Sequence, residues 1–380
     1  MNSNQNKELY IGLMSGTSLD GVDGVLAQFS QNKWQILAYD KQPFSHSLYK
    51  ELLALQTAGP NEIHRSALAA NELAEIYARC SKNLCINAQI KSNQVKAMGV
   101  HGQTIRHCPH LSFTCQLNNP ALVAELSHIN TIADFRSRDI AAGGQGAPLV
   151  PLFHRTLFNC SNQNHQNSKQ VVCNIGGIAN ISIFDEKSIS GFDTGPGNTL
   201  LDYWAQKKFG KAYDDGGQQA SLGKINDNLL NQFLKDDYFS QLPPKSTGRD
   251  LFNGDWLNNH LNKMKFKLKD LDVLNTLSQL TARTIAQDVI KYAENCCRLY
   301  LCGGGVYNKN LIKQLQSELN HFSQNEVSVL TTIELGIPPE CVEALAFAWF
   351  AKCFIDAIPA NSPSVTGAKG ERILGALYPA

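Results

Sequence analysis

The feature that most constrains the fold of this 380-residue chain is a glycine-rich turn that follows an apolar run at three places. Each run has the composition of a buried strand, and each turn stands where that strand would end. Glycine at such a point exposes backbone N–H groups without a Cβ in the way, which is what a phosphate group needs in order to bind. A single such turn would indicate only a tight bend, but three of them favour nucleotide phosphates. The turns are Ser15-Gly16-Thr17-Ser18, Ile175-Gly176-Gly177-Ile178 and Cys302-Gly303-Gly304-Gly305.

Around these turns, both halves of the chain have the same order of predicted elements: a strand, a glycine turn, another strand, one or more helices and a further strand. The expected strands are 9–14, 25–29, 34–38, 95–100, 171–175, 178–184 and 298–302, and the expected helices are 61–85, 197–208, 225–235, 272–292 and 308–319. Strands interleaved with helices predict layered α/β structure. The repeat therefore predicts two similar α/β lobes with a cleft between them. The polar residues 159–170, ahead of the second copy, predict an exposed loop.

Composition and charge exclude several classes of protein. With 34 basic and 33 acidic side chains, the formal net charge is +1, which gives no reason to expect nucleic acid or a membrane as a partner. Eleven cysteines without a compact spacing argue against a secreted disulfide scaffold. The first eight residues lack the apolar core of a signal peptide, and the most apolar stretch, residues 344–358, is interrupted by Lys352 and Asp356. We therefore expect a soluble cytoplasmic protein.

Known local motifs do not account for the glycine turns. After Gly16 no Gly-Lys-Ser/Thr follows at the spacing of a P-loop, and residues 303–305 lack the outer glycine of a dinucleotide fingerprint. Residues 107–110 with Cys115 do not predict a zinc site either, because no second ligand pair follows at the usual spacing. The turns are therefore interpreted as phosphate-binding backbone, and no metal other than magnesium is expected.

Several longer strings, in order and over essentially the whole chain, resemble the sequences of the anhydro-N-acetylmuramic acid kinases. They are Gly12–Asp23, Val100–Thr104, Ala133–Arg136, Gly143–Pro151, Asn174–Asn180, Phe192–Asn198, Ser246–Asn253, Cys302–Asn308 and Pro338–Ala348. The resemblance implies the fold of the sugar kinases, Hsp70 and actin, with two ribonuclease H-like lobes and an active-site cleft between them. We expect the first lobe to comprise residues 1–138 and 361–380, and the second lobe to comprise residues 139–360.

The resemblance also implies a reaction. Such enzymes use ATP and magnesium to phosphorylate 1,6-anhydro-N-acetylmuramic acid while water opens its anhydro bridge. The product is N-acetylmuramic acid 6-phosphate, an intermediate in the recycling of bacterial cell-wall peptidoglycan. The resemblance further suggests a homodimer.

The catalytic base is expected at Asp193. Opening an anhydro bridge requires a carboxylate that deprotonates the attacking water. The resemblance places this base at Asp193, just before the glycine-rich residues 194–197, where a turn would hold a carboxylate at the edge of a cleft. The alternative is that Asp193 caps the helix that begins near Gly197, although Asn198 or Thr199 would serve nearly as well.

The ATP site is expected on all three glycine turns. The resemblance assigns the ATP-phosphate loop to residues 16–23, where Thr17 and Ser18 can donate hydroxyl hydrogen bonds to phosphate oxygens. Residues 303–305 with Asn308 would let adenine and ribose approach the backbone, unless Asn308 merely caps the helix that starts there. The expected ATP-binding residues are Gly16, Thr17, Ser18, Leu19, Asp20, Gly21, Val22, Asp23, Gly176, Gly177, Gly303, Gly304, Gly305 and Asn308.

Magnesium is expected at Asp20 and Asp23, which would hold the ion through water. The alternative is that both are hairpin residues that accept backbone N–H bonds. In the wider superfamily the first phosphate loop usually starts with an aspartate at the end of the strand, whereas this chain has Met14-Ser15 there.

Sugar binding is expected mainly at the ends of strands in the first lobe. Gln103 and Thr104 suit sugar hydroxyls or an acetamide, and the planar fork of Arg136 suits the lactyl carboxylate of the substrate. Arg136 would otherwise pair with Asp134 or Asp139, and Glu343 would otherwise be an ordinary glutamate on a solvated helix face. The expected substrate-binding residues are Ser15, Gln103, Thr104, Arg136 and Glu343.

Two other functions compete with this interpretation. A kinase for another amino sugar, such as N-acetylglucosamine, would need a base on the sugar hydroxyl and not on a water. An actin-like or Hsp70-like ATPase would leave Gln103, Arg136 and Asp193 without an obvious task, and we expect no appended peptide-binding domain. The residues alone give no role for Arg249, which lies in the string 246–253.

Overall fold

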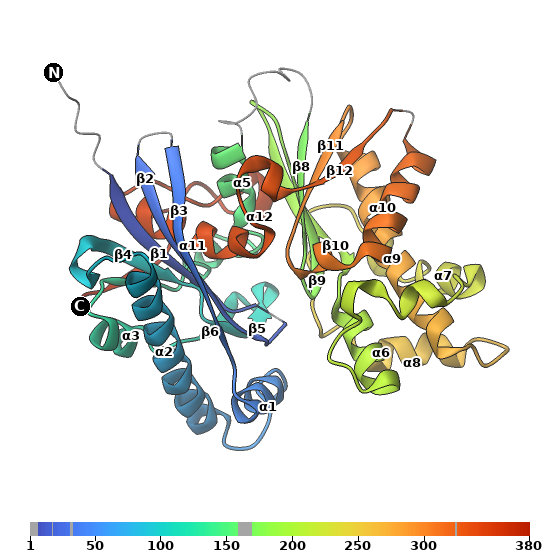
Figure 1. Ribbon diagram of the computed structural model, residues 1–380, viewed down its shortest axis with the longest axis horizontal. Coiled ribbons are helices and arrows are strands. Elements are labelled where there is room, and N and C mark those ends of the chain that lie inside the picture. Colours follow the sequence, from blue (N-terminus) through green and yellow to red (C-terminus); the bar gives the residue numbers. More distant parts are fainter. Residues whose placement is uncertain (1–6, 17, 31–32, 159–168, 324) are drawn as a thin grey trace. The chain divides into compact units, whose positions relative to one another are not determined.

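The computed structural model describes residues 7–16, 18–30, 33–158, 169–323 and 325–380 (Figure 1). The predicted phosphate-loop residue Thr17, and residues 159–168 of the predicted exposed loop, lie outside this part of the chain. The strands are β1 (Glu8–Met14), β2 (Gly21–Ser30), β3 (Lys33–Pro43), β4 (Val95–Val100), β5 (Gln103–Cys108), β6 (Phe113–Leu117), β7 (Thr131–Ala133), β8 (Gln170–Ile175), β9 (Ile178–Phe184), β10 (Ile189–Pro196), β11 (Arg298–Cys302), β12 (Ser328–Thr331) and β13 (Ala376–Tyr378).

Helices connect and cover these strands. They are α1 (His46–Ala54), α2 (Glu62–Asn87), α3 (Pro120–Ser127), α4 (Ser137–Ala141), α5 (Val150–Phe158), α6 (Thr199–Phe209), α7 (Asp227–Phe233), α8 (Gly254–Asn262), α9 (Asp270–Tyr292), α10 (Lys309–Phe322), α11 (Val342–Ile355) and α12 (Pro363–Thr366). Within the ranges described above, no helix combines the length and the apolar character that a membrane span requires.

The chain divides into two compact units, residues 1–153 with 340–380 and residues 154–339. This division differs from the predicted lobe boundaries, because α4 and α11 belong to the first unit. The reason is close packing of α11 on two strands: a Cβ on Gly12 of β1 would lie 1.8 Å from the carbonyl oxygen of Ala344, and one on Gly99 of β4 would lie 2.1 Å from that of Phe347. The two glycines therefore let the backbone of α11 lie directly on the sheet.

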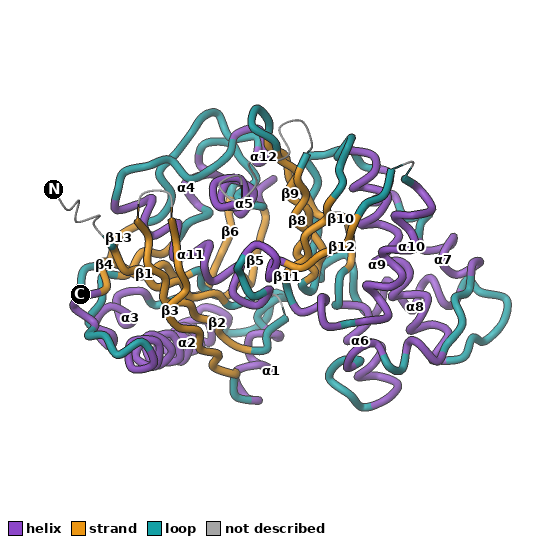
Figure 2. The backbone as a smooth tube through the Cα atoms, turned by 45° about the horizontal axis from the view of Figure 1, so that its top comes forward, coloured by secondary structure: helices purple, strands orange, loops and turns teal. Residues whose placement is uncertain are grey.

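The sheet of the first unit has the strand order β13-β7-β4-β1-β2-β3. Figure 2 draws its strands in orange, with β13, β4, β1, β2 and β3 labelled. Strands β1, β2 and β3 form an antiparallel meander, while β4 pairs parallel to β1 and β7 parallel to β4. Ile11 and Leu13 point into the core shared with α1, α2 and α3, and Gly12 between them faces α11 on the other side. This alternation is the period of two that a strand imposes on its side chains.

The sheet of the second unit repeats this plan. Its order is β10-β9-β8-β11-β12, with β8, β9 and β10 antiparallel and with β11 and β12 parallel to β8. Helices α9 and α10 cover one face of the sheet, and α6, α7 and α8 pack with the start of α9 around a separate aromatic core. Three antiparallel strands followed by two parallel ones is the ribonuclease H-like arrangement, so the two-lobe α/β fold class is confirmed.

Most predicted elements are present with small changes in length, but β10 was not predicted. Gly191, Gly195 and Pro196 interrupt this segment in the sequence, and such residues normally indicate a turn. The expectation of a turn over residues 194–197 is therefore wrong, because the edge strand that contains Asp193 continues to Pro196.

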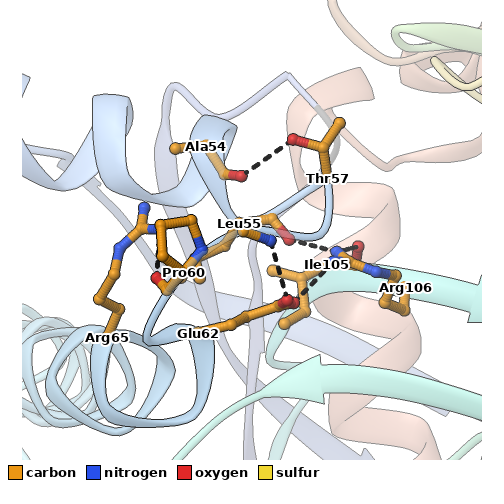
Figure 3. Close-up of polar contacts among 9 residues, drawn as sticks. Ala54, Leu55, Thr57, Pro60, Glu62, Arg65, Ile105 and Arg106 are labelled. Atoms are coloured by element: carbon orange, nitrogen blue, oxygen red, sulfur yellow. Dashed lines mark hydrogen bonds and ion pairs between the residues drawn. The ribbon is translucent and has the colours of Figure 1, made fainter.

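The loop between α1 and α2 is tied to β5 by Arg106 (Figure 3). The Arg106 guanidinium donates to Glu62 at 2.6 Å, to the carbonyl oxygen of Ile105 at 2.9 Å and to the carbonyl oxygen of Leu55. Because β5 begins with Gln103 and Thr104, this anchor fixes the strand that carries two of the predicted sugar-binding residues.

Candidate functional site

Two predicted site residues of the first unit, Ser15 and Arg136, meet a third residue, His101, at one edge of the sheet. The parallel strands β1, β4 and β7 end there, and they are followed by Ser15, His101 and Arg136, respectively. Ligands of α/β sheets bind at this carboxyl edge. The topology therefore brings together residues that are up to 121 positions apart in the sequence, since 136 − 15 = 121.

His101 joins these segments. Its Nδ1 lies 3.2 Å from the carbonyl oxygen of Ser15, and its Nε2 lies 3.1 Å from Nε and 3.0 Å from Nη2 of Arg136. Since a guanidinium can only donate, Nε2 is the acceptor and Nδ1 carries the proton. Burial and the positive charge of Arg136 lower the pKa of His101 to about 3, so the ring is neutral at physiological pH.

The Arg136 side chain is held from a second direction as well. Its Nη1 donates to the carbonyl oxygen of Gly146 at 2.7 Å, and the amide of Gly146 donates to the buried carboxylate of Asp139 at 2.8 Å. Asp139 also accepts from Asn361 and Thr366, each at 2.8 Å. The carboxylate of Asp139 thus fixes the loop that fixes Arg136. The role of Arg136 in binding the substrate stays a prediction.

Ser15 and Gln103 are buried beside the first glycine turn. The Ser15 hydroxyl bonds to the Tyr77 hydroxyl at 2.7 Å and to the carbonyl oxygen of Gly102 at 3.1 Å. Gln103 Nε2 donates to the carbonyl oxygen of Gly16 at 3.1 Å, while its Oε1 has no hydrogen-bond partner in the part of the chain that the structure describes. A buried amide oxygen without a partner is costly, and a ligand N–H or O–H at this point would satisfy it.

The other two predicted sugar-binding residues lie on β5 and α11. Thr104 follows Gln103, and its hydroxyl accepts from Gln116 on β6 at 3.2 Å. Glu343 lies in the first turn of α11, and the close packing of Ala344 on Gly12 sets its place in the first unit.

Lys41 binds both carboxylates of the predicted magnesium site. Its Nζ lies 2.7 Å from Asp20 and 3.9 Å from Asp23. Ser18 also donates to Asp20, and the Tyr39 hydroxyl donates to Asp23, each at 2.6 Å. Burial opposes ionisation of Asp20, but the hydrogen bonds from Lys41 and Ser18 lower its pKa. Burial raises the pKa of Asp23, against the hydrogen bond from Tyr39.

Direct binding of magnesium by these carboxylates would have to displace the Lys41 ammonium group, whereas the expected binding through water stays a prediction. Among the described residues, no three histidine, cysteine, aspartate or glutamate side chains form a group that could hold a metal ion. Both aspartates accept hydrogen bonds from side chains, and Asp20 also accepts one from a backbone N–H group, as the hairpin alternative expected. Nothing in the sequence indicated that Lys41 would pair with these aspartates. The pairing follows from the register of β2 and β3, which places Lys41 opposite Asp23.

Within the predicted ATP-phosphate loop, two side chains are core residues. Leu19 and Val22 are 1% and 0% exposed and pack in the core of the first unit. Leu19 adopts a positive φ of 59°, and a Cβ on Gly21 would lie 2.3 Å from the carbonyl oxygen of Gln42. Any contact of these residues with a nucleotide would therefore come from their backbone.

The second glycine turn, between β8 and β9, packs on the start of α6. The carbonyl oxygen of Gly176 accepts from the amide of Asn198 at 2.8 Å, and that of Gly177 accepts from the amides of Gly197 and Thr199 at 2.9 and 3.0 Å. A Cβ on Gly197 would lie 2.3 Å from the carbonyl oxygen of Gly176. The turn and the helix start are therefore one rigid backbone surface.

The third glycine turn lies over the end of β8. A Cβ on Gly303, whose φ is +79°, would lie 2.2 Å from Oδ1 of Asn174, and one on Gly305 would lie 2.2 Å from Ile175. At Gly304, by contrast, a Cβ would meet no atom of the described residues within 4 Å. The structure thus brings the second and third turns together through Asn174 and Ile175. Only Gly303 and Gly305 are required by packing.

Asn308 caps α10, as its alternative interpretation had it. Its Oδ1 accepts from the amide of Leu311 at 3.0 Å, and the residue is 8% exposed. The assignment of Asn308 to the nucleotide stays a prediction.

Asp193 lies at a β-bulge in the edge strand β10. It pairs with Asn180 of β9, whereas Gly195 already pairs with Ala179, so Thr194 is the extra residue. A bulge bends a strand and redirects its side chains, which is common beside active sites. The Asp193 carboxylate accepts from the amide of Thr247 at 2.9 Å. Asp193 is not the helix cap, because Asn198 is the N-cap residue of α6.

The backbone of Asp193 is held as firmly as its carboxylate. Its amide donates to the carbonyl oxygen of Lys245 at 3.2 Å, and its carbonyl oxygen accepts from the Tyr238 hydroxyl at 2.6 Å. Sequence reasoning missed Tyr238, Lys245 and Thr247. A signal was available only for Thr247, which lies in the string 246–253 that the sequence singled out without a role.

Comparisons with known proteins agree over the whole chain. A family model described as anhydro-N-acetylmuramic acid kinase matches residues 8–380. A relative of that name from Paraburkholderia xenovorans is 51% identical over 373 residues, covering 98% of each chain. Another from Cupriavidus metallidurans is 48% identical over 386 residues, covering 99% of each.

Solved structures are similar at much lower identity. An activator of 2-hydroxyisocaproyl-CoA dehydratase from Clostridium difficile, with bound ADPNP, has a TM-score of 0.43 at 13% identity, covering 93% of this chain and 99% of that one. A ROK family glucokinase from Streptomyces griseus, in complex with glucose and AMPPNP, has a TM-score of 0.43 at 12% identity, covering 90% and 99%.

Proposed function

This chain belongs to the anhydro-N-acetylmuramic acid kinase family, and we propose that it phosphorylates 1,6-anhydro-N-acetylmuramic acid with ATP while water opens the anhydro bridge. The products are N-acetylmuramic acid 6-phosphate and ADP. The single observation that carries the mechanism is the Asp193 carboxylate, which a bulge redirects and the amide of Thr247 orients.

Asp193 acts as the general base in this proposal. It takes a proton from a water whose oxygen forms a bond to the anomeric carbon, and the bond from that carbon to the bridging oxygen breaks. The released oxygen at carbon 6 then accepts the γ-phosphoryl group, and ADP leaves. Orientation of a base by a backbone N–H keeps it in one rotamer, so that its proton-accepting oxygen has a fixed place.

Backbone turns supply the nucleotide contacts. The second and third glycine turns are packed into one surface through Asn174 and Ile175, and Gly304 adds no packing of its own. Glycine at a position with open space suits the close approach of a ligand. We therefore assign the nucleotide to this surface and to the backbone of residues 16–23.

The sugar contacts lie at the carboxyl edge of the first sheet. Arg136 is held by His101 and Gly146, and the lactyl carboxylate is its proposed partner. The unsatisfied Oε1 of Gln103 is a ready acceptor for a sugar hydroxyl or the acetamide N–H. Both assignments rest on groups that the fold already orients.

Magnesium, when bound, would neutralise charge on the transferring phosphate. We assign it to the nucleotide, because Lys41 already pairs with Asp20 and Asp23. Gly16, Ser18 and the other turn residues would position the phosphates themselves.

The biological setting follows from the reaction. We propose a cytoplasmic homodimer that acts in the recycling of cell-wall peptidoglycan, because its product is a phosphorylated sugar of that polymer. The described cysteines other than Cys302 are free thiols, which suits a reducing compartment.

The test is a mass-spectrometric assay with magnesium-ATP, the anhydro sugar and water labelled with heavy oxygen. A product that carries one phosphate and one labelled oxygen is expected. Phosphate without label would indicate a plain sugar kinase with another acceptor chemistry, and ATP consumption without a sugar product would indicate an actin-like or Hsp70-like ATPase.

Asp193→Asn tests the base in the same assay. The amide keeps an acceptor for Thr247 but cannot take the proton, so we expect kcat to fall by about 10²- to 10⁴-fold with the fold retained. Asp272→Asn is the matched control, because the Asp272 carboxylate also accepts a backbone amide, that of Lys224 at 2.7 Å. A wild-type kcat in Asp193→Asn would remove Asp193 as the base.

A further inference from the structure

The residues around Asp193 include one segment without regular secondary structure. Residues 245–247, named the strap from here on, lie beside β10, which is the edge strand of its sheet. The strap accepts from the amide of Asp193 through the carbonyl of Lys245 and donates to its carboxylate through the amide of Thr247. Strand edges are commonly covered in this way. Here the cover also holds the proposed base.

The strap is anchored by a buried charge. The Lys245 side chain is only 2% exposed, and its Nζ lies 3.2 Å from Asp288 of α9. The ammonium also lies 5.6 Å from the ring centre of Phe192 and 5.2 Å from that of Tyr238. Phe192 immediately precedes Asp193, and Tyr238 binds the carbonyl oxygen of Asp193. Both ring contacts of this ammonium therefore lead back to the same short stretch of β10, while Asp288 ties it to α9.

A buried ion pair needs an explanation other than stability. Desolvation of both ions offsets much of their attraction, and apolar residues of similar volume are often as stable. An ion pair with one defined partner holds the two side chains, and the backbone that carries them, in a single arrangement. Burial raises the pKa of Asp288, while the positive charge of Lys245 and its hydrogen bond oppose that rise.

We propose that Lys245 is a positioning residue for the reaction: through Asp288 it fixes the strap, and the strap orients the Asp193 carboxylate. The proposal rests on the proposed function, in which Asp193 is the base. Because the Lys245 side chain is almost fully buried, it acts through Asp193 and not on the substrate. The proposal gives the segment before the string 246–253 a task.

The experiment compares two variants of the full-length protein. Lys245→Met alone leaves Asp288 buried without its cation, so it loses thermal stability as well as activity. The double variant Lys245→Met/Asp288→Leu removes both charges, and its melting temperature is expected to stay close to that of the wild type. Its kcat is expected to fall by about 10- to 100-fold, since a misplaced catalytic group costs about this much. KM for ATP and for the anhydro sugar is expected to change by less than about threefold.

The matched control is Arg283→Met. Arg283 is on the same helix, α9, and pairs with Glu318 of α10. The Arg283→Met variant loses an ion pair of the same helix that does not involve the strap. Its kcat is therefore expected to stay at the wild-type value.

Two outcomes separate the proposals. Suppose that the double variant has the melting temperature and the kcat of the wild type, so that both recover from their values in Lys245→Met. Lys245 is then merely structural, and the inference is wrong. If Asp193→Asn keeps its wild-type kcat, the proposed function fails whatever Lys245 does.

Discussion

Removal of the imidazole acceptor at position 101 should weaken binding of the sugar through Arg136. In His101→Phe the ring keeps its packing on Phe347, whose ring centre lies 4.9 Å away, but both nitrogens are lost. Two guanidinium donors, at 3.1 and 3.0 Å, then lose their shared acceptor. A hydrogen bond to a charged group contributes about 1.5 to 3 kcal/mol. Because Gly146 still holds Nη1 at 2.7 Å, we take the lower end of that range.

A loss of about 1.5 kcal/mol corresponds to a rise of about tenfold in KM for the sugar. The assay measures initial rates at saturating ATP with 1,6-anhydro-N-acetylmuramic acid and with 1,6-anhydro-N-acetylglucosamine, which lacks the lactyl carboxylate. We expect kcat/KM to fall only for the carboxylate-bearing sugar, because Arg136 is proposed to bind that group. His154→Phe, which removes a buried histidine bonded to Ser182, is the control. Equal losses with both sugars, or no loss with either, would refute this reasoning.

Two further predictions concern stability and the third glycine turn. Burial lowers the pKa of both His101 and His154 from 6.5 to about 3. Between these values the unfolded chain binds protons that the folded chain does not, so stability falls as pH falls, by up to about 1.4 kcal/mol per pH unit for each ring. Urea unfolding from about pH 7 to about pH 5 should show a weaker dependence in His154→Phe, and equal slopes would contradict the assignment. Gly303→Ala should destabilise the fold, whereas Gly304→Ala should leave the melting temperature unchanged and raise KM for ATP; an unchanged KM would exclude nucleotide contact there.

The local pattern of the chain was sufficient to predict both strand–turn–strand units. Apolar runs and glycines act over a few residues, so β4, β9 and β11 have the predicted limits. By contrast, β10 was missed because it contains glycines and a proline, which normally indicate a turn. A strand tolerates them here because it lies at the edge of the sheet and contains a bulge, and both are tertiary features. Lobe boundaries were displaced for a similar reason. Helix α11 belongs to the first unit because it packs on Gly12 and Gly99 of that unit's sheet. Its position in the sequence does not reveal this packing.

The residues proposed for catalysis and binding came from the sequence, and their hydrogen-bond partners came only from the tertiary structure. Asp193, Arg136 and Gln103 stand in recognisable strings, since chemistry selects residue types that can be read directly. Thr247 binds Asp193 from 54 positions away, and His101 binds Arg136 from 35 positions away. The spacing of residues in the sequence does not predict such contacts. They arise when separate strands end at one edge of a sheet, or when the strap lies beside the edge strand β10. The sequence alone therefore named the groups that could react, and the folded backbone decided which neighbours orient them.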